Sequence, residues 1–132
     1  MRYFPVFLDL QSAPALIVGG GEVAARKLAL LRQAGAWITV VAPTVAAGVA
    51  ESARGGQLRW LARRFDPADV TGMRIVIAAT GDREVNAAVA MAAREAGIPA
   101  NVVDDAARST FIVPAIVDRS PLVVAISSSG VA

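Results

Sequence analysis

The stretch "PALIVGGGEVAARKLALLRQAG", residues 14–35, joins an apolar run to three glycines and then to a helical pattern. The segment "ALIVGG" at 15–20 predicts a buried strand, and the residues after it place apolar side chains on one helical face. Gly35 follows at the position where a left-handed residue ends a helix. A strand, a glycine turn and a helix in this order predict the first unit of a dinucleotide-binding fold.

The rest of the chain up to residue 105 repeats the alternation of strands with helices. Thr44 and Asp82 are expected to cap two further helices, which end near residue 54 and at residue 96, and Asp66-Pro67 opens a short helical turn. Strands separated by helices favour right-handed crossovers and a parallel sheet. We therefore predict an α/β fold, a Rossmann-like doubly wound parallel sheet. Its further strands are expected over 37–42, 58–63, 74–80 and 99–104.

The pattern changes after Asp105. "STFIVPAIV" and "LVVAIS" flank "DRSP" and leave no room for a helix, so they predict a β-hairpin with its turn at 118–121. Pro114 in the first arm indicates an edge or a bulge. The chain is thus divided into a dinucleotide-binding domain, 1–105, and a hairpin extension, 106–132. An apolar hairpin needs cover, and a second subunit is one way to supply it.

Composition excludes several classes of function. The 132 residues contain neither Cys nor His, which excludes thiolate nucleophiles, Ser-His-Asp triads and the usual zinc sites. Acid–base chemistry must therefore use Asp, Glu, Lys or Tyr. The net charge is +2, and no basic cluster alternates with aromatic residues, so no nucleic-acid partner is expected. No membrane span or good signal peptide is evident, and a cytoplasmic location is expected.

The glycine turn fits G-x-G-x-x-A. Gly19 permits the tight turn, Gly21 lets the backbone approach a pyrophosphate, and Ala24 allows the helix to pack closely on the strand. An empty glycine turn is the alternative, and the strand–turn–helix context favours the dinucleotide. The acid that usually binds the ribose of NAD is missing, because Pro43 and Thr44 stand at the end of the second strand, and no Arg lies beside them in the sequence. The motif alone leaves NAD and NADP open.

Two acids stand at the carboxyl end of a strand, where ligands bind in open α/β sheets. They are Asp104 and Asp105, and the alternative for them, equally weighted, is an Asx-type turn. Thr80 ends the fourth strand, where it can reach a cofactor. Asn101 is either a site residue or a buried, satisfied amide. The serines from Ser127 onward end the last predicted strand, and the alternative for them is a flexible polar tail.

These pieces together resemble the dehydrogenase/ferrochelatase module at the N-terminus of sirohaem synthase, which also occurs as a stand-alone precorrin-2 dehydrogenase. The hairpin stretch is far more specific than the glycine turn. The resemblance covers nearly the whole chain and rests on "PVFLDL", "LIVGGGEVAARK", "AATGDREVN", "NVVDD" and "STFIVPAIVDRSPLVVAISSSG".

The resemblance implies oxidation of precorrin-2 to sirohydrochlorin with NAD⁺ as hydride acceptor. In bifunctional members of the family Fe²⁺ is then inserted to give sirohaem. Asp104 matches the family's general base, and a homodimer is implied. The implied cofactor contacts are Gly19, Gly20, Gly21, Glu22, Val23, Pro43, Thr44 and Thr80. Ser128 matches a serine near the tetrapyrrole, and we add Asn101, Asp105, Arg108 and Arg119 as candidate substrate contacts, because the substrate is a polycarboxylate.

Two departures from the family pattern follow. The family reads "SSGG" where this chain has Ser128-Ser129-Gly130-Val131, and family members continue into a dimerisation segment and a helical domain. We therefore expect the chain to be one part of such a protein. A dinucleotide-sensing regulatory domain without chemistry of its own is the main alternative, and a purely structural module is a weaker one.

Overall fold

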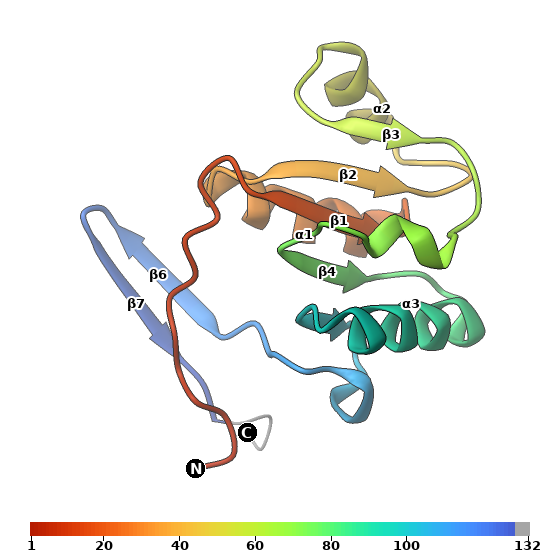
Figure 1. Cartoon of the computed structure of the whole chain (residues 1–132). Helices are drawn as coiled ribbons and strands as arrows, with labels where there is room; N and C mark the ends of the chain where they lie inside the picture. The colour runs from red at the N-terminus through yellow and green to blue at the C-terminus, as the bar shows by residue number, and fades with distance from the viewer. Residues whose placement is uncertain (129–132) are drawn as a thin grey trace.

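The computed structural model describes residues 1–128 and contains a five-stranded parallel sheet in the order β3-β2-β1-β4-β5 (Figure 1). The order reverses between β1 and β4, which is the position where doubly wound sheets open a ligand crevice. This arrangement confirms the predicted fold class. The strands are β1 Pro14–Val18, β2 Trp37–Val41, β3 Arg59–Leu61, β4 Ile75–Ala78 and β5 Ala100–Val102.

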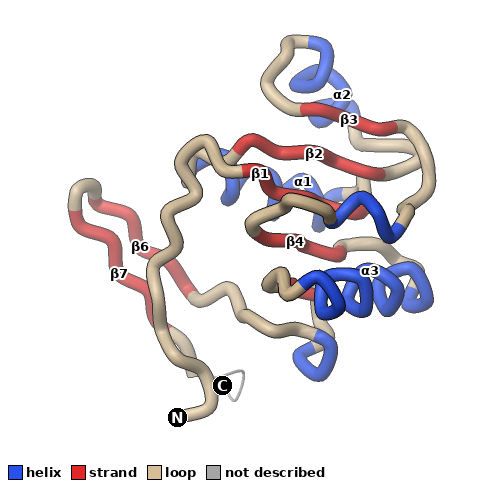
Figure 2. Tube along the Cα trace, viewed as in Figure 1, coloured by secondary structure: helices blue, strands red, loops and turns tan. Residues whose placement is uncertain are grey.

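Helices cover both faces of this sheet (Figure 2). The helices α1, Glu22–Gln33, and α2, Ala47–Arg54, pack on one face. The helix α3, Arg83–Ala96, and the 3₁₀ turn η1, Pro67–Val70, pack on the other. Asp82 caps α3 through its side chain, and Gly97 ends it in the left-handed region, as predicted. No helix within residues 1–128 has the length and apolar character of a membrane span.

The core lies in two layers because successive strand residues point to opposite faces of the sheet. In β1, Ala15 and Ile17 face α1, whereas Leu16 and Val18 face α3. All four side chains are buried. A strand buried on both faces needs a continuous apolar run, and this is why "ALIV" shows no polar alternation.

The outer edge of β5 is closed by the segment that leaves the sheet. The hydroxyl oxygens of Ser109 and Thr110 accept hydrogen bonds of 2.8 Å from the backbone N–H groups of Val102 and Ala100. A second 3₁₀ turn, η2 at Ala106–Arg108, precedes them. These bonds satisfy the edge groups that an unprotected strand would expose.

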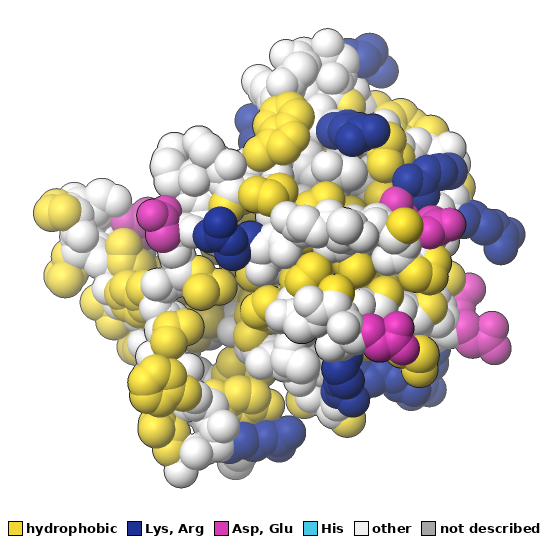
Figure 3. Space-filling view, viewed as in Figure 1, with side chains coloured by type: hydrophobic (Ala, Val, Ile, Leu, Met, Phe, Trp, Pro, Cys, Tyr) yellow, Lys and Arg dark blue, Asp and Glu magenta, His cyan; other side chains and the backbone are white. Residues whose placement is uncertain are grey.

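The hairpin beyond this segment extends away from the sheet (Figure 1). Its strands are β6, Ala115–Arg119, and β7, Leu122–Ile126, paired antiparallel. Every residue of both strands is exposed. Hydrophobic side chains gather on the side of the molecule where this hairpin and the N-terminal segment lie (Figure 3).

Several predicted boundaries were wrong. The strands end before the polar or glycine residues that we assigned to them, because the chain leaves the sheet to build the loops at its carboxyl edge. The hairpin turn is narrower than predicted: Asp118 and Arg119 belong to β6, and Ser120-Pro121 connects the strands. Pro114 precedes the strand rather than interrupting it. Thr44 does not cap α2, which begins at Ala47 without a side-chain cap.

Candidate functional site

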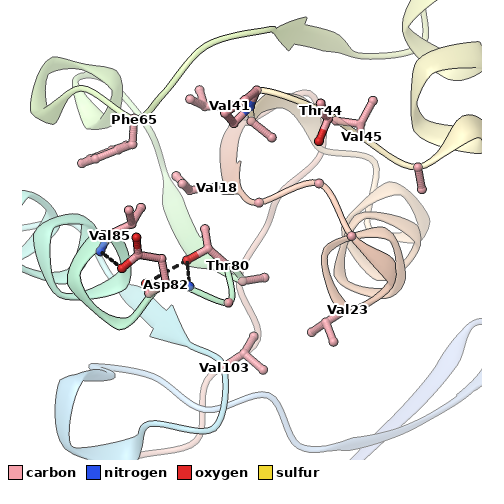
Figure 4. Close-up of a pocket in the computed structure, with 18 of the residues that line it drawn as sticks. Val18, Val23, Val41, Thr44, Val45, Phe65, Thr80, Asp82, Val85 and Val103 are labelled. Carbon is pink, nitrogen blue, oxygen red and sulfur yellow. Dashed lines mark hydrogen bonds between the residues drawn. The ribbon is translucent and has the colours of Figure 1, made fainter.

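A cleft of about 840 Å³ lies at the carboxyl edge of the sheet (Figure 4). It is within the range of small-molecule and cofactor sites. Most of its lining comes from the glycine turn after β1, the segment after β2 and the turn after β4, and the loops after β3 and β5 add a few residues. The residues that line it include Gly19, Gly20, Gly21, Glu22, Val23, Pro43, Thr44, Arg64, Phe65, Thr80, Asp82 and Asp104. The structure thus brings all eight predicted cofactor contacts and Asp104 to one cleft.

The first two glycines are required by the fold itself. Gly19 has φ +129°, and a Cβ there would collide with the carbonyl oxygen of Ala79. A Cβ on Gly20 would collide with the carbonyl oxygen of Thr44. The Ala46 N–H also donates to the Gly20 carbonyl at 2.8 Å. The segment after β2 therefore packs against the glycine turn, which explains why Thr44 does not begin the helix.

Gly21 differs from its two neighbours. No atom lies within 4 Å of the place that its Cβ would take. Gly21 is the N-cap residue of α1, which no side chain caps, so the first N–H groups of the helix face the cleft. Such N–H groups and the positive end of the helix dipole favour an anion. The turn therefore fits the pyrophosphate of a dinucleotide, and an alanine at Gly21 would occupy space next to it.

The segment after β2 lacks the acid that usually binds an adenosine ribose. Pro43 and Thr44 line the cleft there. The structure corrects one part of the sequence reading, since it brings Arg64 and Phe65 from the loop after β3 to the same cleft. Arg64 lies 20 residues beyond Thr44 in the chain, and only the parallel pairing of β3 with β2 places it there. The residues next to Thr44 in the sequence therefore give no indication of Arg64.

The turn after β4 is held by Asn86, which our sequence analysis missed. Asn86 Oδ1 accepts hydrogen bonds from the Thr80 hydroxyl at 2.6 Å and from the Thr80 N–H at 3.2 Å. Its Nδ2 donates to the Thr80 carbonyl at 3.0 Å. The Thr80 hydroxyl also lies 3.1 Å from the Asp82 N–H, which donates to it (Figure 4). Thr80 thus shapes the cleft wall, and its hydroxyl already has partners within the protein.

Three acids line the cleft, and their surroundings differ. The Asp82 carboxylate is occupied, since it accepts from the N–H groups of Glu84 and Val85. Glu22 is the first residue of α1, next to the proposed pyrophosphate position. Asp104 follows β5, is exposed and adopts φ +60°, a left-handed conformation that Asp tolerates better than most residues. Within residues 1–128 its carboxylate has no hydrogen bond or ion pair, so it is available to a ligand.

Asp105 has a different role from its neighbour. Its carboxylate forms an ion pair with Arg108 at 2.9 Å and accepts a hydrogen bond from the Arg108 N–H at 3.2 Å. The side-chain hydrogen bond from Arg108 is the main cause that lowers the pKa of Asp105. An ionised carboxylate held in this way caps η2 and is a poor proton acceptor. Of the two acids weighed above, Asp105 thus matches the Asx-type alternative.

None of the five predicted substrate contacts lines the cleft in this single chain. Asp105 and Arg108 form the ion pair described above. The Asn101 Nδ2 donates to the Phe111 carbonyl at 3.1 Å, so its amide is satisfied by the backbone. Arg119 is the last residue of β6, and the hairpin turn points away from the carboxyl ends of the sheet strands (Figure 1). Ser128 follows β7, and Ser129-Gly130-Val131 lie outside the described residues. Within residues 1–128 no three acidic, Cys or His side chains are grouped to hold a metal.

The sequence of residues 6–115 matches the family described as "Putative NAD(P)-binding". The chain belongs to this NAD(P)-binding family. A nicotinamide dinucleotide is therefore the cofactor class of this chain, and the glycine turn and the uncapped helix of the cleft fit its pyrophosphate. The match ends at residue 115, where the hairpin begins, so membership concerns the sheet domain.

Relatives of this NAD(P)-binding chain carry more specific names. It is 56% identical over 130 residues to "Siroheme synthase 1" of Aeromonas salmonicida and 55% identical to "Siroheme synthase" of Methylococcus capsulatus. The match covers 98% of this chain but 28% and 27% of those proteins, so the chain spans little more than a quarter of their length. A solved structure named "SirC, precorrin-2 dehydrogenase" is similar with a TM-score of 0.82 and 34% identity, over 98% of this chain and 64% of that one.

Proposed function

We propose that this chain is the dehydrogenase part of a sirohaem-forming protein and oxidises precorrin-2 to sirohydrochlorin with NAD⁺. The observation that carries the proposal is the exposed carboxylate of Asp104 beside a glycine-turn cleft in a chain without histidine. The names of the siroheme synthases and of the precorrin-2 dehydrogenase support this reaction class.

The oxidation removes a hydride and a proton from the tetrapyrrole. Bound NAD⁺ supplies the hydride-accepting ring carbon. The protein's residues must then place the substrate and receive the proton. The glycine turn and the uncapped helix α1 hold the pyrophosphate, and the turn fixed by Asn86 shapes the cleft wall on the β4 side. Asp104 is the proposed proton acceptor. Asp82 and Asp105 are occupied as a helix cap and as an ion-pair partner, and Glu22 lies at the start of α1 beside the proposed pyrophosphate position.

The choice of NAD over NADP belongs to the proposal and rests on the resemblance. The structure offers a direct way to test it, since Arg64 is a cation on the cleft beside Thr44. We expect NAD⁺ to bind more tightly than NADP⁺ in calorimetry. The reverse preference, abolished in Arg64→Gln, would assign the 2′-phosphate to Arg64.

The hairpin is proposed to pair with a second copy of the chain. Cross-strand neighbours point to the same face, so Ala115, Val117 and Leu122 lie on one face and Ile116 and Val123 on the other. Both faces therefore carry exposed apolar side chains, a pattern that a monomer covers poorly. We propose that Arg119 and Ser128 make their substrate contacts in such a dimer, at the partner's cleft.

The proposal extends to insertion of Fe²⁺ into sirohydrochlorin, with iron as a substrate. The exchange releases two pyrrole protons, and Asp104 is the proposed acceptor. Iron-dependent loss of sirohydrochlorin absorbance, in parallel with the dehydrogenase assay, tests this second step. Asp104→Asn should slow both the dehydrogenation and the iron insertion. If it slows the dehydrogenation alone, Asp104 is not the base of the iron insertion.

Asp104→Asn provides the decisive test of the dehydrogenase. Asn tolerates the left-handed backbone of position 104 and preserves the side-chain shape, but it cannot take a proton. We expect unchanged NAD⁺ affinity and turnover lowered by about 10²–10⁴-fold, the usual contribution of a general base. NADH formation with precorrin-2 is the measurement, made on the full-length protein. Wild-type turnover in the Asn variant would remove Asp104 from this role, and NAD⁺ binding without any response to tetrapyrrole would favour the sensing domain.

A further inference from the structure

A second hollow of about 330 Å³ adjoins the dinucleotide cleft. The two share Thr80, Val103 and Asp104, so the hollow lies beside the proposed base. Arg83, the first residue of α3, also lines it. Arg83 was not among the residues singled out in the sequence, because its position at the start of a helix carries no signal for a binding site.

The positive charge of Arg83 does not stabilise the start of α3. A cation at a helix N-terminus faces the positive end of the dipole, where acids are preferred. The side chain gains no compensating ion pair, since the two ion pairs described within residues 1–128 are Arg63–Asp69 and Arg108–Asp105. The N–H groups of Glu84 and Val85 are already capped by Asp82, which leaves the Arg83 guanidinium as the cationic group among the residues that line the hollow.

Of the two arginines near the hollow, Arg108 is held in an ion pair, whereas Arg83 has none within residues 1–128. The pKa of Asp105 is lowered mainly by its hydrogen bond with Arg108 and to a smaller extent by the charge of Arg83. Arg108 and Asp105 thus neutralise each other, and Arg108, which we predicted as a substrate contact, is already paired. Among the residues that line the hollow, the charges left are Arg83 and the Asp104 carboxylate.

We propose that the Arg83 guanidinium binds a peripheral carboxylate of the tetrapyrrole and so holds the macrocycle against Asp104. This inference rests on the proposed function and adds a substrate subsite to it. A planar guanidinium forms two parallel hydrogen bonds to a carboxylate, which fixes orientation as well as distance. Arg83 is a positioning residue in this account, because the proton goes to Asp104.

Equilibrium titration with sirohydrochlorin, in the presence of saturating NAD⁺, tests the subsite in the full-length protein. Arg83→Gln should weaken tetrapyrrole binding by about tenfold or more, as expected for loss of a charge-assisted bond. Arg83→Lys should recover part of the affinity, and NAD⁺ affinity should not change. Arg94→Gln is the matched control, since Arg94 is an exposed arginine in the last turn of the same helix. The methyl ester of sirohydrochlorin, which lacks the charges, should bind the wild type and Arg83→Gln alike.

Equal affinity of the wild type and Arg83→Gln for sirohydrochlorin would overturn the subsite while leaving the proposed function intact. The same holds if Arg94→Gln shows an equal loss or if the ester shows the same dependence on Arg83. A wild-type protein that binds NAD⁺ but no tetrapyrrole would instead overturn the proposed function, and the subsite with it. In steady state, Arg83→Gln should raise KM for precorrin-2 far more than it lowers kcat.

Discussion

The sheet domain and the β6–β7 hairpin both contain runs of apolar strand residues, yet these residues differ in burial. In the sheet domain the side chains of β1 and β4 are buried from both faces. In the hairpin every strand residue is exposed. Hydrophobic strands therefore do not by themselves form a core, because burial requires a second layer. The sheet has its helices within the chain, whereas no helix of residues 1–128 covers the hairpin.

The largest expected effect contrasts one isoleucine in each region. Ile77 in β4 is 1% exposed, and Ile126 in β7 is 63% exposed. Ile77→Ala removes buried methyl groups and leaves a cavity, so we expect the free energy of unfolding to fall by about 2–5 kcal/mol. Ile126→Ala should change it by less than about 0.5 kcal/mol. Urea denaturation at a protein concentration that keeps the chain monomeric measures both, and equal losses would show that the hairpin is already part of the core.

The next effect concerns association through the hairpin. Val117→Lys places a charge among the apolar side chains proposed to meet a second copy. We expect the dimer dissociation constant to rise by about 30-fold or more, corresponding to a central interface residue of about 2 kcal/mol. Met91→Lys is the control, since Met91 is 64% exposed on α3, outside the hairpin. Sedimentation velocity is the measurement, and a monomeric wild-type protein would refute the proposed pairing.

A smaller effect distinguishes two glycines of the turn after β1, since Gly21 is expected to matter for binding and Gly20 for stability. Gly21→Ala should leave stability unchanged and weaken NAD⁺ binding by about tenfold, or roughly 1.4 kcal/mol, because its methyl group enters the pyrophosphate space. Gly20→Ala should lower the melting temperature, because its methyl group meets the Thr44 carbonyl. Gly55→Ala, with ordinary contact distances and negative φ, serves as the control. Calorimetry and thermal unfolding distinguish the outcomes; an unchanged NAD⁺ affinity in Gly21→Ala would place the pyrophosphate elsewhere.

The smallest effect is electrostatic and belongs to the sheet domain. Arg63 donates a 2.6 Å hydrogen bond to Asp69, and this bond is the main cause that lowers the Asp69 pKa. A lowered folded-state pKa gives stability that is complete above the unfolded value of about 3.9 and is lost as the pH falls below it. We expect Asp69→Asn to cost at most about 1 kcal/mol at pH 7. The free energies of unfolding of the wild type and Asp69→Asn should converge as the pH falls. A difference that stays constant with pH would contradict the ion-pair explanation.

The sequence predicted the order of the elements well because β1, β2 and β4 are predominantly apolar runs and α1 and α3 are followed by glycine. It predicted the strand ends poorly, because pairing stops where the chain is needed for loops, and composition does not mark that point. The glycine turn was predictable residue by residue, since Gly19 and Gly21 have conformational or spatial reasons to lack a side chain. Ala24 was equally predictable, since it is buried where α1 packs on the sheet.

The residues that the sequence did not reveal reach the site through strand pairing and through the closure of local turns, which composition does not show. Arg64 arrives through the pairing of β3 with β2, and Arg83 through the packing of α3 against the sheet. Asn86 lies within the quoted "AATGDREVN", but its three hydrogen bonds to Thr80 depend on how the turn after β4 closes. The left-handed backbone of Asp104 is likewise invisible in the sequence.

The central claim is that one cleft holds the dinucleotide across the carboxyl edge of the sheet with its nicotinamide toward Asp104. A crystal structure of the full-length protein with NAD⁺ tests it most directly. The account predicts the pyrophosphate at the N–H groups after Gly20, the adenosine beside Thr44 and Phe65, and the nicotinamide ring on the Asp104 side with room for a tetrapyrrole between them. A dinucleotide bound in the opposite direction, or an Asp104 side chain turned away from the nicotinamide, would contradict it.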